Sequence, residues 1–284
     1  MSNEQISKIL PTNDVMFKML FGDAKHSRVL IHFLNCVIKG KSPIESIDII
    51  HNELNPEYIG QKGSRIDILA KTKDGELVNI EMQREDEKNM TARALFYWSK
   101  LFSGQLEVSQ KYHQLKRTIS INILNFTLFE NDERYWRKGY LKDDHNNEKF
   151  TDLLEMHFLE LNKMRQVEEE SPITFWIEFF KDPYSQKIAS ICEFVPEIRE
   201  AKSIFEKAKS DPEAQELMRI REKAIRDYTS DIASAKDEGK VEGAIAKAKE
   251  SALSMLNDGM PIETISKYTG LSESEIRSIN GQSE

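Results

Sequence analysis

The chain has 284 residues, of which 31% are charged and 39% hydrophobic, a composition typical of folded rather than disordered proteins. Its longest uncharged stretches, 29–38 and 118–129, are shorter than the ~18 to 20 apolar residues that cross a membrane, and the start, MSNEQISKIL, lacks the apolar core of a signal peptide. We therefore expect a cytoplasmic protein with no membrane partner.

The formal net charge of −8 is unevenly distributed. Residues 1–130 carry a net charge of +1, whereas residues 131–284 carry −9. A protein that coats nucleic acid nonspecifically needs a basic excess, because neutralised phosphates supply most of that affinity. Any contact with nucleic acid must therefore be local.

The first half of the chain predicts two helices followed by strands. Apolar residues recur at helical spacing in two runs within 12–38, which end at Gly22 and Gly40. A strand is expected from Ile44, and the segments RIDILAKT and ELVNIEMQ flank Asp74-Gly75 as a β-hairpin. A helix is expected over 89–109, with Leu95, Trp98 and Phe102 on its apolar side. A buried strand over 117–128 and a further strand over 153–161 complete an α/β sandwich of order ααβββαβ.

Two carboxylates lie on the predicted hairpin, and the loop length decides whether they meet. A two-residue turn at Asp74-Gly75 would put Asp67 and Glu81 on opposite faces. A three-residue loop, Lys73-Asp74-Gly75, with Gly75 left-handed in a bulge, sets Asp67 directly opposite Glu81. The second register also gathers Ile66, Ile68, Ala70, Val78, Ile80 and Met82 on the other face, as a buried sheet surface requires.

Paired carboxylates across two strands repel each other unless a cation lies between them. Mg²⁺ would relieve the repulsion, since it binds through one or two carboxylates and keeps several waters. Gln83, on the same face as Glu81, is placed to orient one of those waters. The alternative is that both acids are simply solvated on an exposed strand face.

These residues resemble a known family. The segments TNDVMFKMLFG, RIDILAKTKDGELVNIEMQ, TARALFYWSKLFSGQL and GMPIETISKYTGLSESEI resemble, in this order, the Rpn family of recombination-promoting nucleases, which is grouped with transposases in the PD-(D/E)XK superfamily. The resemblance implies a restriction-endonuclease-like αβββαβ core with an α-helical C-terminal region. It implies a PD-(D/E)XK nuclease domain over 1–165. The residue pattern beyond it predicts a helical region with a long Ala/Glu/Lys/Arg-rich helix over 166–256 and a small helix-turn-helix-like unit over 257–284.

The resemblance further implies Mg²⁺-dependent DNA endonuclease chemistry, in which Mn²⁺ can substitute. Asp67, Glu81 and the Met82 carbonyl would hold the metal, and Gln83 stands where the superfamily more often has lysine. Asp14 would be an extra acid near the metal, or else a first-turn residue favoured by the helix dipole.

Arg93 and Tyr97, four residues apart on one helix face, would border the site and contact a DNA phosphate. The alternative for Arg93 is an ion pair with the acidic run 85–87.

The last residues predict a helix over 261–267, a turn at Thr269-Gly270 and a capping box from Ser272 to Glu275 that opens a second helix. This pattern resembles a helix-turn-helix, but residues 257–284 carry a net charge of −3. The charge favours a protein contact, self-association or docking within the chain, over DNA reading. Glu238-Gly239 and Glu242-Gly243 in the preceding helix place two glycines on one face, which would permit close helix contact in a homo-oligomer through the C-terminal helices. The alternative is that this helix is simply solvated.

The leading hypothesis is a metal-dependent DNA endonuclease. Two others remain open: a non-catalytic oligomeric interaction protein with a vestigial site, and a transposase that performs strand transfer, for which the sequence supplies no means of recognising transposon ends.

Overall fold

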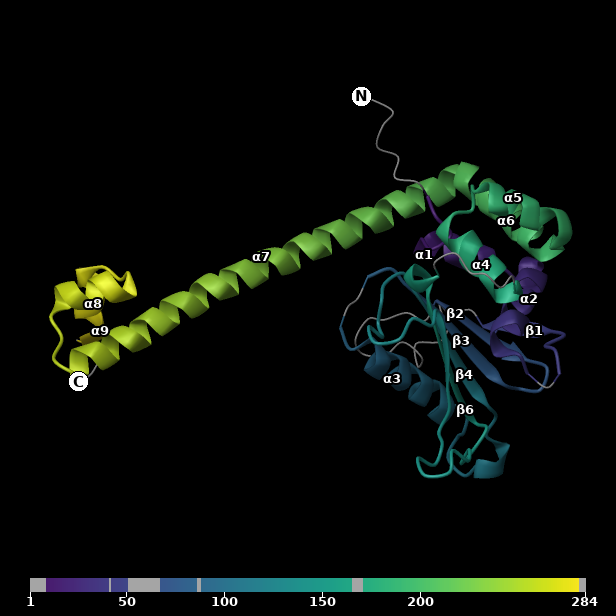
Figure 1. Cartoon of the computed structure of the whole chain (residues 1–284), viewed down its shortest axis with the longest axis horizontal. Helices are drawn as coiled ribbons and strands as arrows, with labels where there is room; N and C mark the ends of the chain where they lie inside the picture. Colours follow the sequence, from purple (N-terminus) through teal and green to yellow (C-terminus); the bar gives the residue numbers. More distant parts are fainter. Residues whose placement is uncertain (1–8, 41, 51–66, 86–87, 165–170, 281–284) are drawn as a thin grey trace. The chain divides into compact units, whose positions relative to one another are not determined.

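The computed structural model describes residues 9–40, 42–50, 67–85, 88–164 and 171–280 (Figure 1). Its contacts divide the chain into two compact units, Met1–Met218 and Arg219–Glu284. The helices are α1 (Asp14–Phe21), α2 (Ser27–Ile38), α3 (Met90–Ser103), α4 (Pro172–Lys181), α5 (Gln186–Phe194), α6 (Pro196–Ser210), α7 (Pro212–Asn257), α8 (Ile262–Thr269) and α9 (Glu273–Asn280). In the described part of the chain, no helix is long and apolar enough to cross a membrane.

A six-stranded mixed sheet, in the order β1-β2-β3-β4-β6-β5, forms the centre of the first unit. β3 and β4 run parallel, as do β4 and β6, while β1-β2, β2-β3 and β5-β6 are antiparallel. The strands are β1 (Ile47–Ile50), β2 (Ile68–Thr72), β3 (Leu77–Gln83), β4 (Thr118–Leu124), β5 (Trp136–Gly139) and β6 (Leu154–Glu160). The mixed α/β fold with a helical C-terminal region confirms the predicted fold class.

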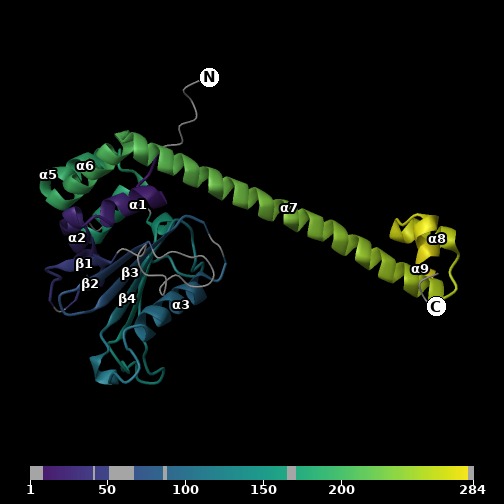
Figure 2. The same cartoon turned by 180° about the vertical axis from the view of Figure 1, so that it is seen from behind.

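One face of the sheet is covered by α1, α2, α4 and α6, and the opposite face by α3 (Figures 1 and 2). The first layer has an aromatic core in which the Trp176 ring of α4 contacts Phe21 of α1 and Phe33 of α2. Phe205 of α6 packs on Phe179 in the same cluster. Helices from beyond residue 170 therefore complete the core that also holds α1 and α2.

α3 differs from its prediction in length and in its buried face. It spans Met90–Ser103, and it buries Met90, Ala94, Tyr97 and Leu101, whereas Leu95 is 50% exposed. The prediction had placed the large rings of Trp98 and Phe102 on the buried face. Both residues are only partly buried and stack on each other, and the Trp98 indole N–H donates to the Thr118 carbonyl.

Two further local features were missed by the sequence patterns. β5 is a short edge strand with Arg137 and Lys138 at its centre, so it has no apolar alternation to reveal it. At the end of α2, Lys39 rather than Gly40 takes the left-handed conformation, with φ of 47°.

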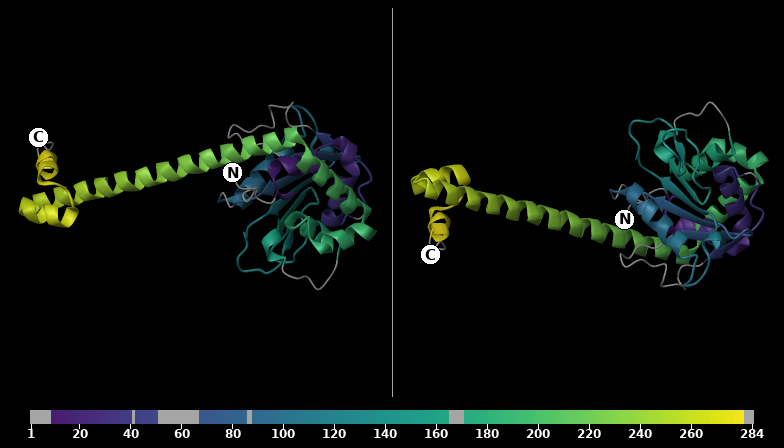
Figure 3. Two further views of the ribbon diagram at one scale, coloured as in Figure 1. Left: turned by 90° about the horizontal axis from the view of Figure 1, so that it is seen from above. Right: turned by 90° about the horizontal axis from the view of Figure 1, so that it is seen from below.

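The Arg219–Glu284 unit contains most of α7 followed by α8 and α9, which pack on the end of α7 (Figure 3). Its small core contains Ala252, Ile265, Leu271 and Ile276. Gly270 ends α8 in the left-handed conformation, and the Ser272 backbone N–H and hydroxyl both donate to the Glu275 carboxylate. The turn and the capping box predicted from the sequence are therefore present.

Candidate functional site: two carboxylates at the ends of the parallel strands

The β2-β3 hairpin has the three-residue loop that brings the two acids together. Gly75 is left-handed, with φ of 87°, and its N–H donates to the Thr72 carbonyl. Ile68 pairs with Ile80 and Ala70 with Val78, so continuing the register by one residue sets Asp67 opposite Glu81. The side chains of Ile68, Ala70, Val78, Ile80 and Met82 are buried on the other face, as predicted, and Ile66 lies outside the described residues.

Asp67 precedes β2 and is fixed by contacts on both of its carboxylate oxygens. Its Oδ2 accepts from the Met82 backbone N–H at 2.9 Å, and its Oδ1 lies 3.8 Å from the Lys18 ammonium. Burial raises the pKa of Asp67, although the Met82 hydrogen bond and the Lys18 charge act in the opposite direction. The neighbouring charge of Asp14 raises this pKa further.

Glu81, near the carboxyl end of β3, is 2% exposed. Among the described residues its Oε1 has no hydrogen-bond partner. Burial raises the pKa of Glu81 well above its usual range, and the nearby Asp67 adds to the increase. A buried carboxylate without a partner is costly when ionised, so this group needs either a proton or a cation.

The carboxylate pair is suited to a hard divalent cation. It offers a buried oxygen that has no partner among the described residues, and two acids that raise each other's cost of ionisation. A cation would relieve both. The described residues contain no group of three His, Cys, Asp or Glu side chains that could hold a metal. Mg²⁺ does not require one, because waters usually complete its coordination.

The other predicted site residues lie close by. Asp14 begins α1 and acts electrostatically on Asp67. Gln83 ends β3, where its carbonyl accepts from the Asn125 N–H. By strand alternation its side chain is on the Glu81 face, whereas the Met82 side chain is buried on the opposite face.

Arg93 and Tyr97 occupy one side of α3. The Arg93 charge lowers the pKa of both Asp67 and Glu81, which places its guanidinium in the electrostatic range of the pair. It lies 5.7 Å from the centre of the Tyr97 ring, and Tyr97 is only 7% exposed. Two of the three acids in the run proposed as an alternative partner, 86 and 87, lie outside the described residues.

Lys18 is a site residue that sequence reasoning missed. It lies one helical turn after Asp14, so the DVMFK pattern of α1 sets both side chains on one face. The hairpin register could not reveal it, because α1 packs on the opposite face of the sheet. The spacing of Asp14 and Lys18 was the available signal.

Two buried amides next to Glu81 were missed as well. Asn79 and Asn122 are 1% and 0% exposed, and Asn122 pairs with Glu81 across β3 and β4. In the described chain, both polar side-chain atoms of Asn79 and the Oδ1 of Asn122 lack hydrogen-bond partners. The Asn79 amide favours the charged form of Glu81, so it lies close to that carboxylate, although within the described chain the two groups do not meet hydrogen-bond geometry. Such a concentration of unsatisfied groups is typical of a functional site.

Replacing Asn79 with Val should raise the free energy of unfolding of the metal-free protein by about 1 kcal/mol, because two buried unpaired polar atoms are removed. Thr118→Val is the matched control on the same face, since Thr118 accepts from Gln105 at 2.8 Å and should lose about 1 kcal/mol. Urea unfolding in the presence of a chelator measures both. A larger loss for Asn79→Val than for Thr118→Val would mean that the Asn79 amide is paired.

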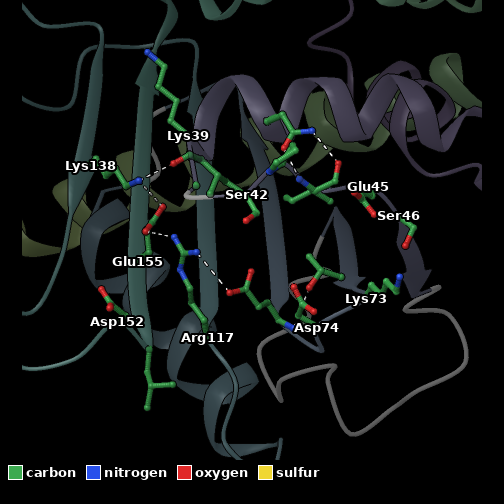
Figure 4. Close-up of a pocket in the computed structure, with 18 of the residues that line it drawn as sticks. Lys39, Ser42, Glu45, Ser46, Lys73, Asp74, Arg117, Lys138, Asp152 and Glu155 are labelled. Atoms are coloured by element: carbon green, nitrogen blue, oxygen red, sulfur yellow. Dashed lines mark hydrogen bonds and ion pairs between the residues drawn. The ribbon is translucent and has the colours of Figure 1, made fainter.

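A cavity of about 820 Å³ lies at the other end of the strands and has a different character (Figure 4). Glu155, which lines it, is held by Arg117 and Lys138, and Arg117 also pairs with Glu76. These charges neutralise one another. Because the pair Asp67 and Glu81 is not among its lining residues, the cavity is separate from the candidate site.

The site stands at the carboxyl ends of β3 and β4, the usual position for ligands in open α/β sheets. No curated protein and no solved structure matches the chain. Residues 11–235 match the model of the PD-(D/E)XK nuclease family transposases, and residues 246–281 match that of the C-terminal HTH domain of the Rpn/YhgA-like nuclease family. The chain therefore belongs to the PD-(D/E)XK nuclease family transposases and ends in an Rpn/YhgA-like helix-turn-helix domain.

Proposed function

We propose that the protein is a metal-dependent DNA endonuclease that hydrolyses phosphodiester bonds. The observation that carries the proposal is the pair Asp67 and Glu81, set opposite each other, with a buried Glu81 oxygen that lacks a partner in the described chain. Membership in a nuclease family supports the same chemistry.

Asp67, Glu81 and the Met82 carbonyl would hold Mg²⁺, or Mn²⁺ in its place. When bound, the cation lowers the pKa of water and neutralises charge on the scissile phosphate. The Met82 N–H fixes the orientation of Asp67. Gln83 is placed to orient the attacking water, and Asp14 would contribute a further acid.

Arg93 would bind a DNA phosphate from the α3 side of the site. Its planar, permanently charged guanidinium is suited to that contact. Tyr97, mostly buried against the sheet, would act mainly by holding Arg93, whose guanidinium faces its ring.

Cleavage of supercoiled plasmid by the purified protein tests the proposal. Nicked or linear product should form with Mg²⁺ or Mn²⁺ and should be absent with a chelator. The alternative function is a non-catalytic interaction protein with a vestigial site. It predicts that neither cation yields cleavage product, although the protein still forms oligomers.

The match to a helix-turn-helix domain supports DNA as a partner, in contrast to the preference for a protein contact that the net charge of residues 257–284 had indicated. We also propose that a second copy of the chain packs on the face of α7 that carries Gly239 and Gly243, where Ile232, two helical turns before Gly239, is 49% exposed. A Cβ added at Gly239 or Gly243 would meet nothing within 4 Å, so a partner helix could approach closely there.

The acidic charge of the second half of the chain is concentrated before the second unit begins. Residues 131–218 carry a net charge of −7, and residues 219–284 only −2. Since α4 and α6 share a core with α1 and α2, most of the acidity belongs to the unit that carries the candidate site. A truncation near Leu161 would not separate this charge from the site without damage, because it would remove Trp176, Phe179 and Phe205 from the core of the unit that carries the site.

A chain ending at Met218 should therefore keep cation-dependent cleavage within about tenfold of the full chain, since it retains the candidate site and loses little net charge. It should also elute as a monomer if α7 forms the oligomer. DNA affinity and size-exclusion chromatography at two salt concentrations measure both effects. A large loss of DNA affinity would identify residues 219–284 as a DNA-binding arm.

A further inference from the structure

Lys18 brings a positive charge to the carboxylate pair from a separate layer of the fold. Its ammonium lies 3.8 Å from Asp67 Oδ1, and its charge lowers the pKa of both Asp67 and Glu81. The side chain is 37% exposed, whereas that of Asp67 is 13% exposed. The lysine can therefore contact both the buried site and a ligand that approaches from solvent.

Gln83 supplies no positive charge to stabilise the transition state of phosphodiester hydrolysis. Phosphodiester hydrolysis joins a water oxygen to phosphorus while the ester P–O bond breaks; the water loses a proton to solvent and the leaving oxygen gains one. Negative charge grows on the phosphate oxygens in the transition state, and a nearby cationic group stabilises it. Gln83 can donate a hydrogen bond but carries no charge.

Arg93 and Lys18 both act electrostatically on the carboxylate pair. The Arg93 guanidinium also lies against the Tyr97 ring of its own helix. Lys18 has a compact ammonium on a flexible stem, so it can move from Asp67 to a phosphate once a divalent cation takes its place. Of the two, Lys18 is better placed to follow the reacting phosphate.

We propose that Lys18 is a catalytic residue that supplies, from α1, the positive charge that Gln83 lacks at the scissile phosphate. The inference rests on the proposed nuclease function. A purely structural Lys18 would only neutralise Asp67 in the metal-free protein. A positive charge introduced at position 83 should then fail to restore the cleavage rate of a variant that lacks Lys18, whereas it should restore the rate if Lys18 is catalytic.

The test compares Lys18→Gln with the double variant Lys18→Gln/Gln83→Lys in plasmid cleavage. Loss of the charge should slow cleavage by about 10²-fold, the scale for one stabilising group at such a site, and the double variant should regain most of the rate. Lys18→Arg, which keeps the charge, should stay within about tenfold of the wild type. Lys25→Gln, an exposed lysine just beyond α1, is the matched control and should cut as the wild type does.

Calorimetric titration with Mn²⁺ supplies a readout that is independent of cleavage. Lys18→Gln should bind Mn²⁺ at least as tightly as the wild type, because the lysine competes with the cation for Asp67. Weaker binding would overturn the inference and make Lys18 a structural support of the site. A double variant as slow as Lys18→Gln would also overturn it.

The two proposals fail in distinguishable ways. If the wild type neither binds Mn²⁺ nor cuts DNA, the nuclease function itself is wrong, and this inference falls with it. If the wild type cuts and Lys18→Gln cuts equally fast, the nuclease function stands and the role of Lys18 is refuted.

Discussion

Glu81→Gln and Asp67→Asn should each abolish Mg²⁺-dependent DNA nicking while the protein remains folded. Both substitutions keep the shape of the side chain and remove the charge that would hold the cation. Glu81→Gln should weaken Mn²⁺ binding more than Asp67→Asn, because Glu81 is the more deeply buried and its Oε1 has no other partner among the described residues. Plasmid nicking and Mn²⁺ titration measure the two losses.

The same variants should be at least as stable as the wild type when no metal is present. Ionised Glu81 is buried beside a second acid, and Gln carries no charge to desolvate. A gain of about 1 kcal/mol in the free energy of unfolding would raise the thermal midpoint by about 2 to 4 °C. Differential scanning calorimetry in a chelator measures the midpoint.

The stability that Glu81→Gln gains relative to the wild type should increase with pH. The folded-state pKa of Glu81 is raised above its ordinary value of 4.5, so the folded protein holds a proton that the unfolded chain has already lost. The stability from that proton is present below pH 4.5 and is lost as pH rises through the raised pKa. The advantage of Glu81→Gln over the wild type should therefore grow as pH rises above 4.5.

Asp48→Asn is the matched control for these variants. Asp48 is an exposed acid on β1, paired in register with Lys71 on the same side of the sheet as Asp67. Its substitution removes the same charge without approaching the pair, so nicking and its cation dependence should persist. Nicking by Glu81→Gln or Asp67→Asn at the wild-type rate would refute the assignment of the metal site.

The sequence could predict the hairpin because two local requirements agreed. Lys-Asp-Gly favours the three-residue loop, and the apolar alternation requires the same register. Asp67, Glu81 and Gln83 were therefore placed on one face before any tertiary contact was known. The same reasoning located α1 and α2, since their apolar spacing is regular.

The remainder of the site depends on contacts between distant segments, which periodicity cannot show. Lys18 reaches Asp67 only because α1 packs across the end of β2, where a Cβ at Gly22 would lie 3.4 Å from Ile68. Asn79 and Asn122 are ordinary strand residues in the sequence. They become informative only when the parallel pairing of β3 and β4 buries them beside Glu81.

Gln83→Ala should slow cleavage by roughly 10² to 10³ fold, the usual scale for the loss of one positioned hydrogen-bonding group. The β3 backbone should hold its place, because the Gln83 carbonyl still accepts from the Asn125 N–H. The loss would then report on the side chain alone. Single-turnover cleavage at saturating Mg²⁺ separates this effect from weaker binding of the cation.

Gln83→Lys should retain cleavage, because a lysine at this position offers hydrogen-bond donors and adds a positive charge near the phosphate. Gln114→Lys is the matched control: it adds the same charge at an exposed glutamine that precedes β4, at the strand end away from the candidate site. Its rate should match the wild type. If Gln83→Lys were inactive while Gln83→Ala cut quickly, position 83 would need a small or neutral side chain, and water positioning would have to be assigned to another group.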